Sequence, residues 1–303
     1  MKKAIVSGAL GLVGRPVVNY LVDNGIDVLC LGRKNLNENE INNYFCKRVK
    51  YVELDMENIN NLPDKIKQLD WEVGNDCSFY NFAWSGVNRL TDGTLKNQLK
   101  NAIYSSLAVK SAKKIGCTKF INCGSVEENF HEWYLYNGSS YDSSQEDYAI
   151  AKLASRDMCS IIAYLEKIDY IHTRLSVPLS PDLSKGGYIS KTLKNIINNE
   201  SYQTPKNNQL YDIISTNDVA RAYYLIGLHG KNKADYFIGS GNPSSLNNFF
   251  KNFKLAVSGN IVKDKEVNYS DISKFFNINN LYSDTGFFAS SYRSDLFDSE
   301  KTK

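Results

Sequence analysis

The chain has 303 residues, with 36 Lys and Arg against 33 Asp and Glu, so its formal net charge is only +3. Such a small positive excess argues against nucleic acid or a membrane surface as the partner. Hydrophobic residues make up 42% and charged residues 23%, which is typical of a soluble globular protein. The length suffices for one large α/β domain, alone or with a smaller second domain.

Targeting and redox features indicate a cytoplasmic protein. No apolar run reaches the length of a membrane span, and Met1-Lys2-Lys3 leads into a predicted strand, not into a signal sequence. The 6 cysteines show neither CxxC pairs nor zinc-like spacing. We therefore expect reduced thiols and no metal site.

The N-terminal segment has the pattern of a phosphate-binding turn. Lys3–Ser7 predicts a short strand, and residues 15–24 predict a helix. Glycines between them allow a tight turn and a close approach to a pyrophosphate, which the free N–H groups of the helix would face. A structural turn would use glycines as well, but the flanking strand and helix favour a dinucleotide. The expected cofactor contacts are Gly8, Gly11, Leu12, Val13 and Gly14.

The end of the second predicted strand, residues 26–31, indicates which dinucleotide binds. NAD sites usually carry Asp or Glu there to bind the ribose 2′-hydroxyl. This chain has Gly32, which removes the repulsion of a 2′-phosphate and leaves space for it, followed by Arg33 and Lys34. Arg33 offers a planar fork of donors to phosphate oxygens. The sequence predicts NADPH, with NAD as the alternative if these cations belong to a solvated loop.

The third predicted strand, residues 49–54, ends at Asp55 and Met56, which we expect beside the adenine. Asp55 either accepts a hydrogen bond from the adenine amino group or caps the next helix.

The fourth predicted strand, residues 76–82, runs into Phe82-Ala83, where the backbone is expected to pass close to the cofactor. Trp84 follows and would wall the substrate side. A long helix over residues 90–115 contains Asn101, an unfavourable choice inside a helix. Asn101 either reaches the active site through water or is exposed.

The candidate catalytic residues lie on the fifth strand, ending at Ser125, and on a helix over residues 145–168. Tyr148 and Lys152 are four apart, so they share one helix face. Free tyrosine titrates near about 10, and a lysine cation one turn away favours its phenolate. Ser125 would supply a hydroxyl to a substrate carbonyl. Tyr-x-x-x-Lys alone is a weak signal, and the upstream glycine motif strengthens it.

The C-terminal half has a looser pattern, with Gly and Pro suggesting a loop after Pro178. We predict strands at residues 171–177, 211–214 and 234–238, and helices at residues 189–198, from Thr216, and at 244–256. The tail after Asp284 has little periodicity.

In this order the motifs resemble the extended short-chain dehydrogenase/reductase family, which includes nucleotide-sugar epimerases, dehydratases and reductases. The resemblance covers about residues 1–285. The glycines match its GxxGxxG, Asp55 its adenine-binding acid, and Asn81-Phe-Ala-Trp84 its fourth-strand motif. Residues 212–222 resemble its "DFIHVDDVARA" segment. The family's catalytic set is matched by Asn101, Ser125, Tyr148 and Lys152.

The resemblance implies a Rossmann domain, an α/β doubly wound parallel sheet, over residues 1–177 and completed by 213–239. A smaller domain of residues 178–212 and 240–303 would bind a nucleotide-diphospho-sugar. The resemblance further implies a homodimer that pairs the helices of Asn101 and Tyr148. Apolar residues for that interface, which could equally be buried within one subunit, are Ile103, Leu107, Val109, Ile161, Ile162 and Leu165.

Departures from the family pattern narrow the expected reaction. The 4,6-dehydratases carry Asp-Glu after the catalytic hydroxyl residue, whereas Ser125 is followed by Val126-Glu127, which argues against dehydration. Glu127 either contacts substrate or serves as a salt bridge or cap. Tyr211 replaces an arginine that often reaches the substrate phosphates, which leaves that contact in doubt.

We therefore expect NADPH-dependent reduction of a nucleotide-linked 4-keto-6-deoxy-hexose. Tyr148 would donate the proton, Lys152 would bind the nicotinamide ribose, and Ser125 would hold the carbonyl oxygen. The alternatives are a 4-epimerase with tightly bound NAD and a non-catalytic dinucleotide-binding regulator. The expected substrate contacts are Trp84, Ser125, Glu127 and Tyr148.

Overall fold

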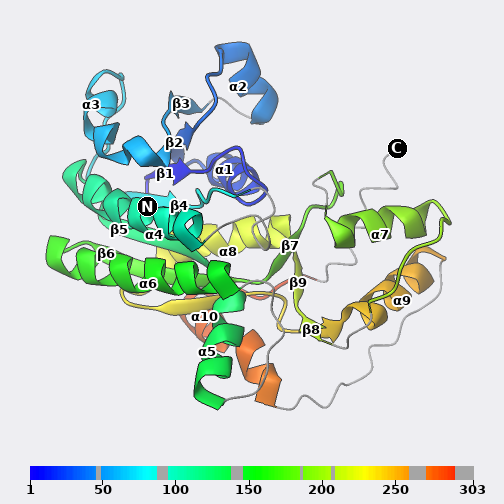
Figure 1. Ribbon diagram of the computed structural model, residues 1–303. Helices are drawn as coiled ribbons and strands as arrows, with labels where there is room; N and C mark the ends of the chain where they lie inside the picture. Colours follow the sequence, from blue (N-terminus) through cyan, green and yellow to red (C-terminus); the bar gives the residue numbers. More distant parts are fainter. Residues whose placement is uncertain are drawn as a thin grey trace.

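A seven-stranded parallel sheet forms the centre of the computed structural model, which describes residues 1–45, 49–86, 95–137, 146–184, 187–205, 209–258 and 271–290 (Figure 1). The strands are β1 (Lys3–Ser7), β2 (Asp27–Gly32), β3 (Lys50–Glu53), β4 (Cys77–Asn81), β5 (Lys119–Ser125), β6 (Asp169–Leu175) and β10 (Asp235–Ile238). Their order is β10-β6-β5-β4-β1-β2-β3. Strands β2 and β3 lie on one side of β1, and the later strands lie on the other side, starting with β4, so the switch point of the topology is between β1 and β4. Ligands of such sheets bind at that crevice, beyond the carboxyl ends of the strands. The prediction of a doubly wound Rossmann sheet is confirmed.

Helices cover both faces of the sheet and bury two hydrophobic cores. On one face α1 (Gly14–Asp23) packs against α8 (Thr216–His229). On the other, α4 (Leu95–Lys114) packs against α6 (Glu146–Glu166), with the 3₁₀ helix η1 (Met56–Asn61) and α3 (Leu62–Lys67) beside α4. The central strands are buried along most of their length because both of their faces are covered.

A third hydrophobic cluster lies away from the sheet, between α7 (Tyr188–Ile197) and α9 (Leu246–Val257) (Figure 1). Two short sheets join this part to the rest: β7 (Val177–Leu179) with β9 (Ile213–Ser215), and β8 (Leu210–Tyr211) with β11 (Ser244–Ser245). Its buried side chains include Leu193, Ile196, Phe249, Phe250 and Phe253. The assignment of this part as a substrate-binding domain stays a proposal.

Several elements differ from the sequence predictions. The strand predicted to run to Val177 ends at Leu175, because β7 leaves the main sheet to pair with β9. Ser244–Ser245 begins as a strand, and the Ser245 side chain caps α9 by accepting from the Asn248 N–H. The helices α2 (Glu38–Tyr44), α5 (Glu127–Asn137) and α10 (Asn279–Thr285) were not predicted, nor were α3 and the 3₁₀ helices η1 and η2 (Asp271–Phe276).

Some predicted features lie outside the described residues. They are the helix starts at residues 90 and 145, the thiol of Cys46, Gly186 and the chain beyond residue 290. The remaining cysteines, Cys30, Cys77, Cys117, Cys123 and Cys159, are free thiols.

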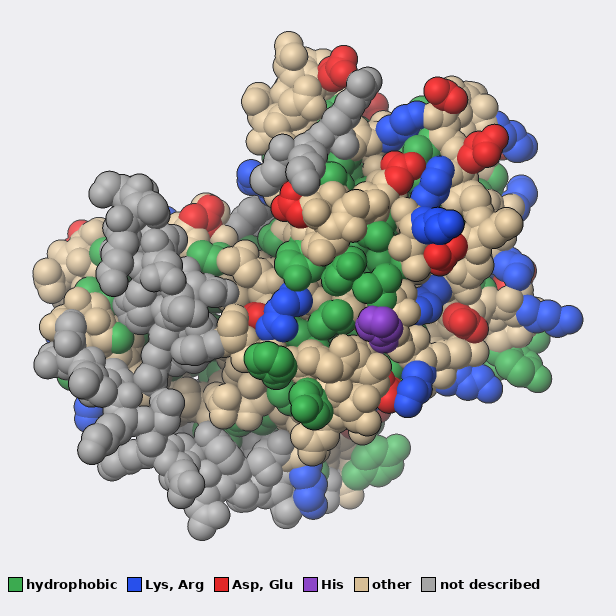
Figure 2. Space-filling view, turned by 180° about the vertical axis from the view of Figure 1, so that it is seen from behind, with side chains coloured by type: hydrophobic (Ala, Val, Ile, Leu, Met, Phe, Trp, Pro, Cys, Tyr) green, Lys and Arg blue, Asp and Glu red, His purple; other side chains and the backbone are tan. Residues whose placement is uncertain are grey.

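The back of the molecule mixes positive and negative side chains, and hydrophobic side chains gather near its middle (Figure 2). Among the described residues, no helix combines the length and apolar character needed to cross a membrane.

Candidate active site

The turn between β1 and α1 packs directly on the segment after β4. Gly8 has a φ of +68°, and a Cβ there would lie 2.8 Å from the Ala83 nitrogen. A Cβ at Gly14 would lie 2.2 Å from the Gly8 carbonyl oxygen, so neither position accepts a side chain. No side chain caps the start of α1, which leaves the helix N-terminus for an anion. This turn therefore fits a dinucleotide pyrophosphate, and the predicted contacts to it stay predictions.

The expectation that Gly32 leaves space for a phosphate is wrong. A Cβ on Gly32 would lie 2.5 Å from the Tyr51 hydroxyl oxygen, so the phenol of Tyr51 fills that space. The Tyr51 hydroxyl donates to the Lys34 carbonyl at 2.8 Å. Burial raises the pKa of Tyr51 to about 12, so the phenol stays neutral. Tyr51 of β3 thus packs over Gly32 of β2, a contact that the local sequence does not reveal.

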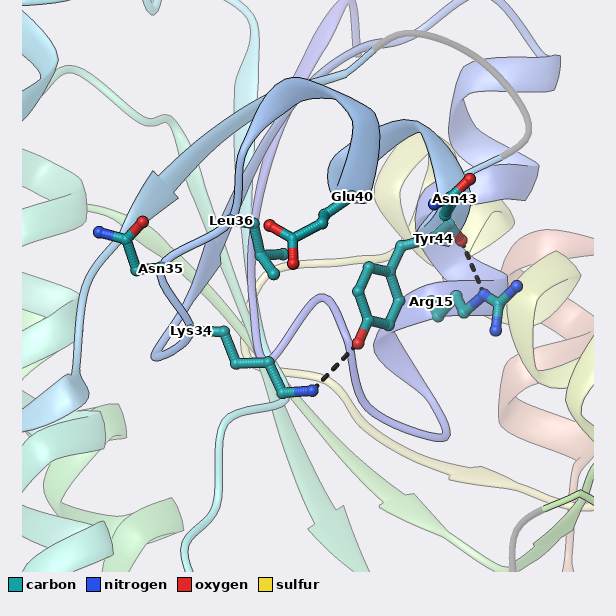
Figure 3. Close-up of a pocket in the computed structure, with 7 residues that line it drawn as sticks. All are labelled: Arg15, Lys34, Asn35, Leu36, Glu40, Asn43 and Tyr44. Carbon is teal, nitrogen blue, oxygen red and sulfur yellow. Dashed lines mark hydrogen bonds between the residues drawn. The ribbon is translucent and has the colours of Figure 1, made fainter.

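A pocket of about 560 Å³ opens beside this strand end (Figure 3). The Lys34 ammonium donates to the Tyr44 hydroxyl at 3.0 Å, and Arg15 Nε donates to the Tyr44 carbonyl at 2.7 Å. Arg33 is exposed and does not line the pocket, so the basic groups there are Lys34 and Arg15. Arg15 was missed, although it directly follows the third glycine of the motif. The lining residues are Arg15, Lys34, Asn35, Leu36, Glu40, Asn43 and Tyr44.

Asp55 takes the capping alternative. Its carboxylate accepts a hydrogen bond from the Glu57 N–H at 3.1 Å and so caps η1. Met56 is partly buried against the core beneath β3. A contact from either residue to adenine remains a prediction.

Trp84, Tyr148 and Lys152 form one cluster at the carboxyl end of the sheet. The rings of Trp84 and Tyr148 meet edge to face with centroids 5.9 Å apart. The Lys152 ammonium lies 3.7 Å from the Trp84 ring centroid and 5.6 Å from that of Tyr148. It also donates to the Cys123 carbonyl at 2.7 Å and is only 4% exposed. The helix spacing thus brings the tyrosine and lysine together, and a buried cation beside a phenol favours the phenolate.

Asn101 is buried, so the alternative of an exposed residue is wrong. Its side-chain oxygen accepts from the Ser85 N–H at 2.7 Å, and its amide nitrogen donates to the Ser85 carbonyl at 3.1 Å. Next to it, Trp84 Nε1 donates to the Gln98 side-chain oxygen at 2.7 Å. Helix α4 therefore fixes the loop that carries Trp84. A catalytic role for Asn101 remains a prediction.

Ser125 is the last residue of β5, two residues before α5 begins at Glu127. Its Oγ accepts from the Glu127 N–H at 3.3 Å. Burial raises the pKa of Glu127 to about 7. The charge of Glu127 also contributes to raising the pKa of Tyr211, mainly raised by burial, so these two side chains lie near each other. Glu127 is thus a partly buried, readily protonated acid two residues after Ser125, with Tyr211 on β8 nearby.

A chain of buried amides joins the strand ends below the site, a feature that sequence reasoning missed. The Ser7 hydroxyl donates to Asn81 Oδ1 at 2.8 Å, and Asn81 Nδ2 donates to Asn122 Oδ1 at 3.0 Å. These bonds join β1, β4 and β5 side by side. Buried polar groups with all partners present rigidify a structure, so the glycine turn and Ser125 are held in fixed relation.

A family model described as the NAD dependent epimerase/dehydratase family matches residues 4–239. The chain belongs to this family. The resemblance drawn from the motifs is confirmed, and the match spans both the glycine turn and the Tyr148–Lys152 helix. The family supports an NAD-dependent enzyme of nucleotide-sugar metabolism.

Individual relatives are more distant. A putative UDP-glucose 4-epimerase of Methanocaldococcus jannaschii is 25% identical over 278 residues, covering 86% of this chain and 85% of that protein. UDP-glucose 4-epimerase of Thermotoga maritima, solved with UDP-glucose, has a TM-score of 0.72 at 17% identity, covering 99% and 100% of the two chains. UDP-glucuronic acid 4-epimerase of Bacillus cereus, in complex with UDP-4-deoxy-4-fluoro-glucuronic acid and NAD, has a TM-score of 0.71 at 16% identity, covering 99% and 98%.

Proposed function

We propose that this protein is a nucleotide-sugar 4-epimerase that uses retained NAD. The observation that carries the proposal is the cluster of Tyr148, Lys152 and Trp84, which Lys152 joins to the Cys123 carbonyl on β5, two residues before Ser125. The curated relative and the structural neighbours named above are 4-epimerases of UDP-sugars, which supports this reaction over the reductase expected from the sequence.

The side chains have complementary roles in this reaction. Hydride acceptance and return at C4 are the chemistry that bound NAD supplies. The Tyr148 phenolate, stabilised by the Lys152 cation, would remove the C4 hydroxyl proton, hold it as the neutral phenol, and return it to the C4 oxygen to form the new hydroxyl. Ser125 donates its hydroxyl hydrogen to the C4 oxygen. Gly8 and Gly14 would hold the pyrophosphate at the start of α1.

The direct test incubates purified protein with UDP-glucose, without added cofactor, and follows UDP-galactose by chromatography. We expect interconversion, and NAD in the supernatant after the protein is denatured. A panel of UDP-N-acetylglucosamine and UDP-glucuronic acid would define the sugar. Absence of interconversion across the panel, in protein shown to carry NAD, would contradict the epimerase proposal.

A second candidate is the NADPH-dependent reductase of a 4-keto sugar. It is favoured by the basic groups of Lys34 and Arg15 in the pocket at the end of β2, where no acid ends the strand (Figure 3). NADPH consumption with a nucleotide-linked 4-keto-6-deoxy-hexose, in protein purified without bound NAD, would support the reductase. If neither NADPH nor NADH is consumed with any nucleotide-linked keto-sugar, the reductase candidate is rejected.

The homodimer remains part of the proposal. On the surfaces of α4 and α6, Ile103, Ile161 and Leu165 are 46%, 56% and 67% exposed, whereas Val109 is buried within the subunit. Pairing of the two helices with those of a second copy would cover the exposed side chains. Light scattering at micromolar concentration should give a dimer, and Ile161→Glu should give a folded monomer. A wild-type monomer would contradict the proposal.

A further inference from the structure

A buried carboxylate and imidazole lie directly behind Ser125 and take no part in the reaction as described. Glu128 is 0% exposed and His172 is 2% exposed. Glu128 Oε1 accepts from the Ser125 backbone N–H at 2.7 Å, and its Oε2 lies 2.9 Å from His172 Nε2. The carboxylate thus joins the backbone of the catalytic serine to a side chain on the neighbouring strand β6.

The direction of these hydrogen bonds follows from the groups involved. An ionised carboxylate only accepts, so Nε2 of His172 carries the proton that it shares with Glu128. The other ring nitrogen, Nδ1, lies 3.3 Å from the Tyr170 hydroxyl. The Tyr170 hydroxyl also accepts from Asn122 Nδ2 at 3.4 Å, which links the pair to the buried amides.

The pair packs so closely on β5 that Gly124 leaves no room for a side chain. A Cβ added to Gly124 would lie 2.2 Å from Glu128 Oε1 and 2.4 Å from His172 Nε2. Lys152 binds the carbonyl of Cys123, the residue before Gly124. The last three residues of β5 are therefore fixed by the lysine at Cys123 and by the carboxylate at Ser125.

The pair also affects the Ser125 hydroxyl. Ser125 Oγ accepts from the Glu127 N–H, and Glu128 accepts from the Ser125 N–H just before α5 begins. Because the helix N–H occupies an acceptor site of Oγ, the hydroxyl hydrogen is free to point to a substrate. Capping a helix does not require the imidazole of His172. Burying the ionised carboxylate of Glu128 costs free energy unless partners such as His172 bind it.

We propose that Glu128 and His172 are positioning residues that fix Ser125 for hydrogen bonding to the C4 oxygen of the substrate. The inference rests on the proposed function, because Ser125 must contact the reacting oxygen. Misplacing a reacting group by about 1 Å can cost roughly 100-fold in rate, so losing the pair should slow turnover without weakening cofactor binding.

The test is a double-mutant cycle on kcat between Glu128→Gln and Ser125→Ala, with NADH affinity and thermal stability measured for every protein. Glu128→Gln keeps the shape of the side chain but not its charge. We expect kcat to fall about 10–100-fold in the wild-type background and less than about twofold in the Ser125→Ala background. NADH affinity should stay unchanged. Glu132→Gln, one turn further along α5 and bound to Arg156 and Arg174, is the control and should keep kcat.

The other outcomes distinguish a failure of the positioning role of Glu128 and His172 from a failure of the proposed role of Ser125. An equal loss of kcat in both backgrounds, or no loss in either, would overturn the positioning role. A wild-type rate in Ser125→Ala would overturn the catalytic serine, and with it the inference, while leaving Tyr148 and Lys152 to be judged by their own variants. If Glu128→Gln does not fold, His172→Gln takes its place in the cycle, with the same expected pattern.

Discussion

Two lysines, at opposite ends of the proposed cofactor site, show how differently one residue type is used. Lys152 is almost fully buried, bonded to a strand carbonyl and packed over Trp84. Lys34 is exposed, lies in the loop after β2 beside an open pocket, and donates a hydrogen bond to the hydroxyl of Tyr44 on α2. We call these the catalytic end and the adenosine end of the site.

This difference in burial explains why the geometry of the catalytic end can be predicted from the sequence and that of the adenosine end cannot. At the catalytic end, a helix spacing of four residues and a buried strand determine the geometry, so few arrangements are possible. At the adenosine end, side chains from α1, α2, β3 and the loop after β2 meet at the surface. Which cation faces a ligand there depends on contacts distant in sequence.

Removing the phenol should have the largest effect, and it tests the catalytic end. Tyr148→Phe keeps the ring beside Trp84 but removes the oxygen that moves the proton. We expect turnover to fall roughly 10²–10⁴-fold with cofactor binding intact. Tyr164→Phe, on the same helix and 68% exposed, is the matched control and should be unaffected. A near-wild-type rate for Tyr148→Phe would reject the proposed chemistry.

The second prediction concerns Glu127, whose pKa burial raises from 4.5 to about 7. An acid with a raised folded-state pKa stabilises the fold when protonated. That contribution is complete below pH 4.5 and is lost as the pH rises through 7. The loss should reach about 3 kcal/mol at most, from 1.36 kcal/mol per pKa unit.

Glu127→Gln should abolish this pH dependence. Relative to the wild type, the variant should gain up to about 3 kcal/mol in free energy of unfolding between pH 4.5 and pH 8, measured by urea denaturation. Glu72→Gln, at an exposed position, should follow the wild-type curve. Parallel curves for Glu127→Gln and the wild type would mean that Glu127 is as well solvated as a surface acid.

The helices that were missed show where sequence reasoning stopped. The Ser125-x-x-Glu128 spacing is a capping-box signal, and Asn37-x-x-Glu40 is another, confirmed by reciprocal hydrogen bonds at the start of α2. Both were visible in the sequence. The contact of Tyr51 with Gly32 was not, because register between β2 and β3 decides which side chain lies over the strand end.

The last and smallest effect is expected at the adenosine end. The pocket contains Lys34 and Arg15 against Glu40, so its lining carries one excess positive charge and Lys34→Ala removes it. The hydrogen bond to Tyr44 raises the pKa of Lys34, which keeps the ammonium charged. The 2′-phosphate of NADP carries close to two negative charges, whereas NAD has a hydroxyl there. Lys34→Ala should therefore weaken NADPH binding by roughly tenfold and NADH binding by less than about twofold, whichever cofactor serves the reaction.

Because the Lys34 ammonium is exposed, the difference between the two cofactors should shrink at 0.5 M salt, where the screening length falls below about 5 Å. Arg33→Ala is the matched control: fluorescence titration should show a smaller loss than for Lys34→Ala, because Arg33 does not line the pocket. A larger loss for Arg33→Ala would restore the sequence prediction and place the phosphate outside the pocket.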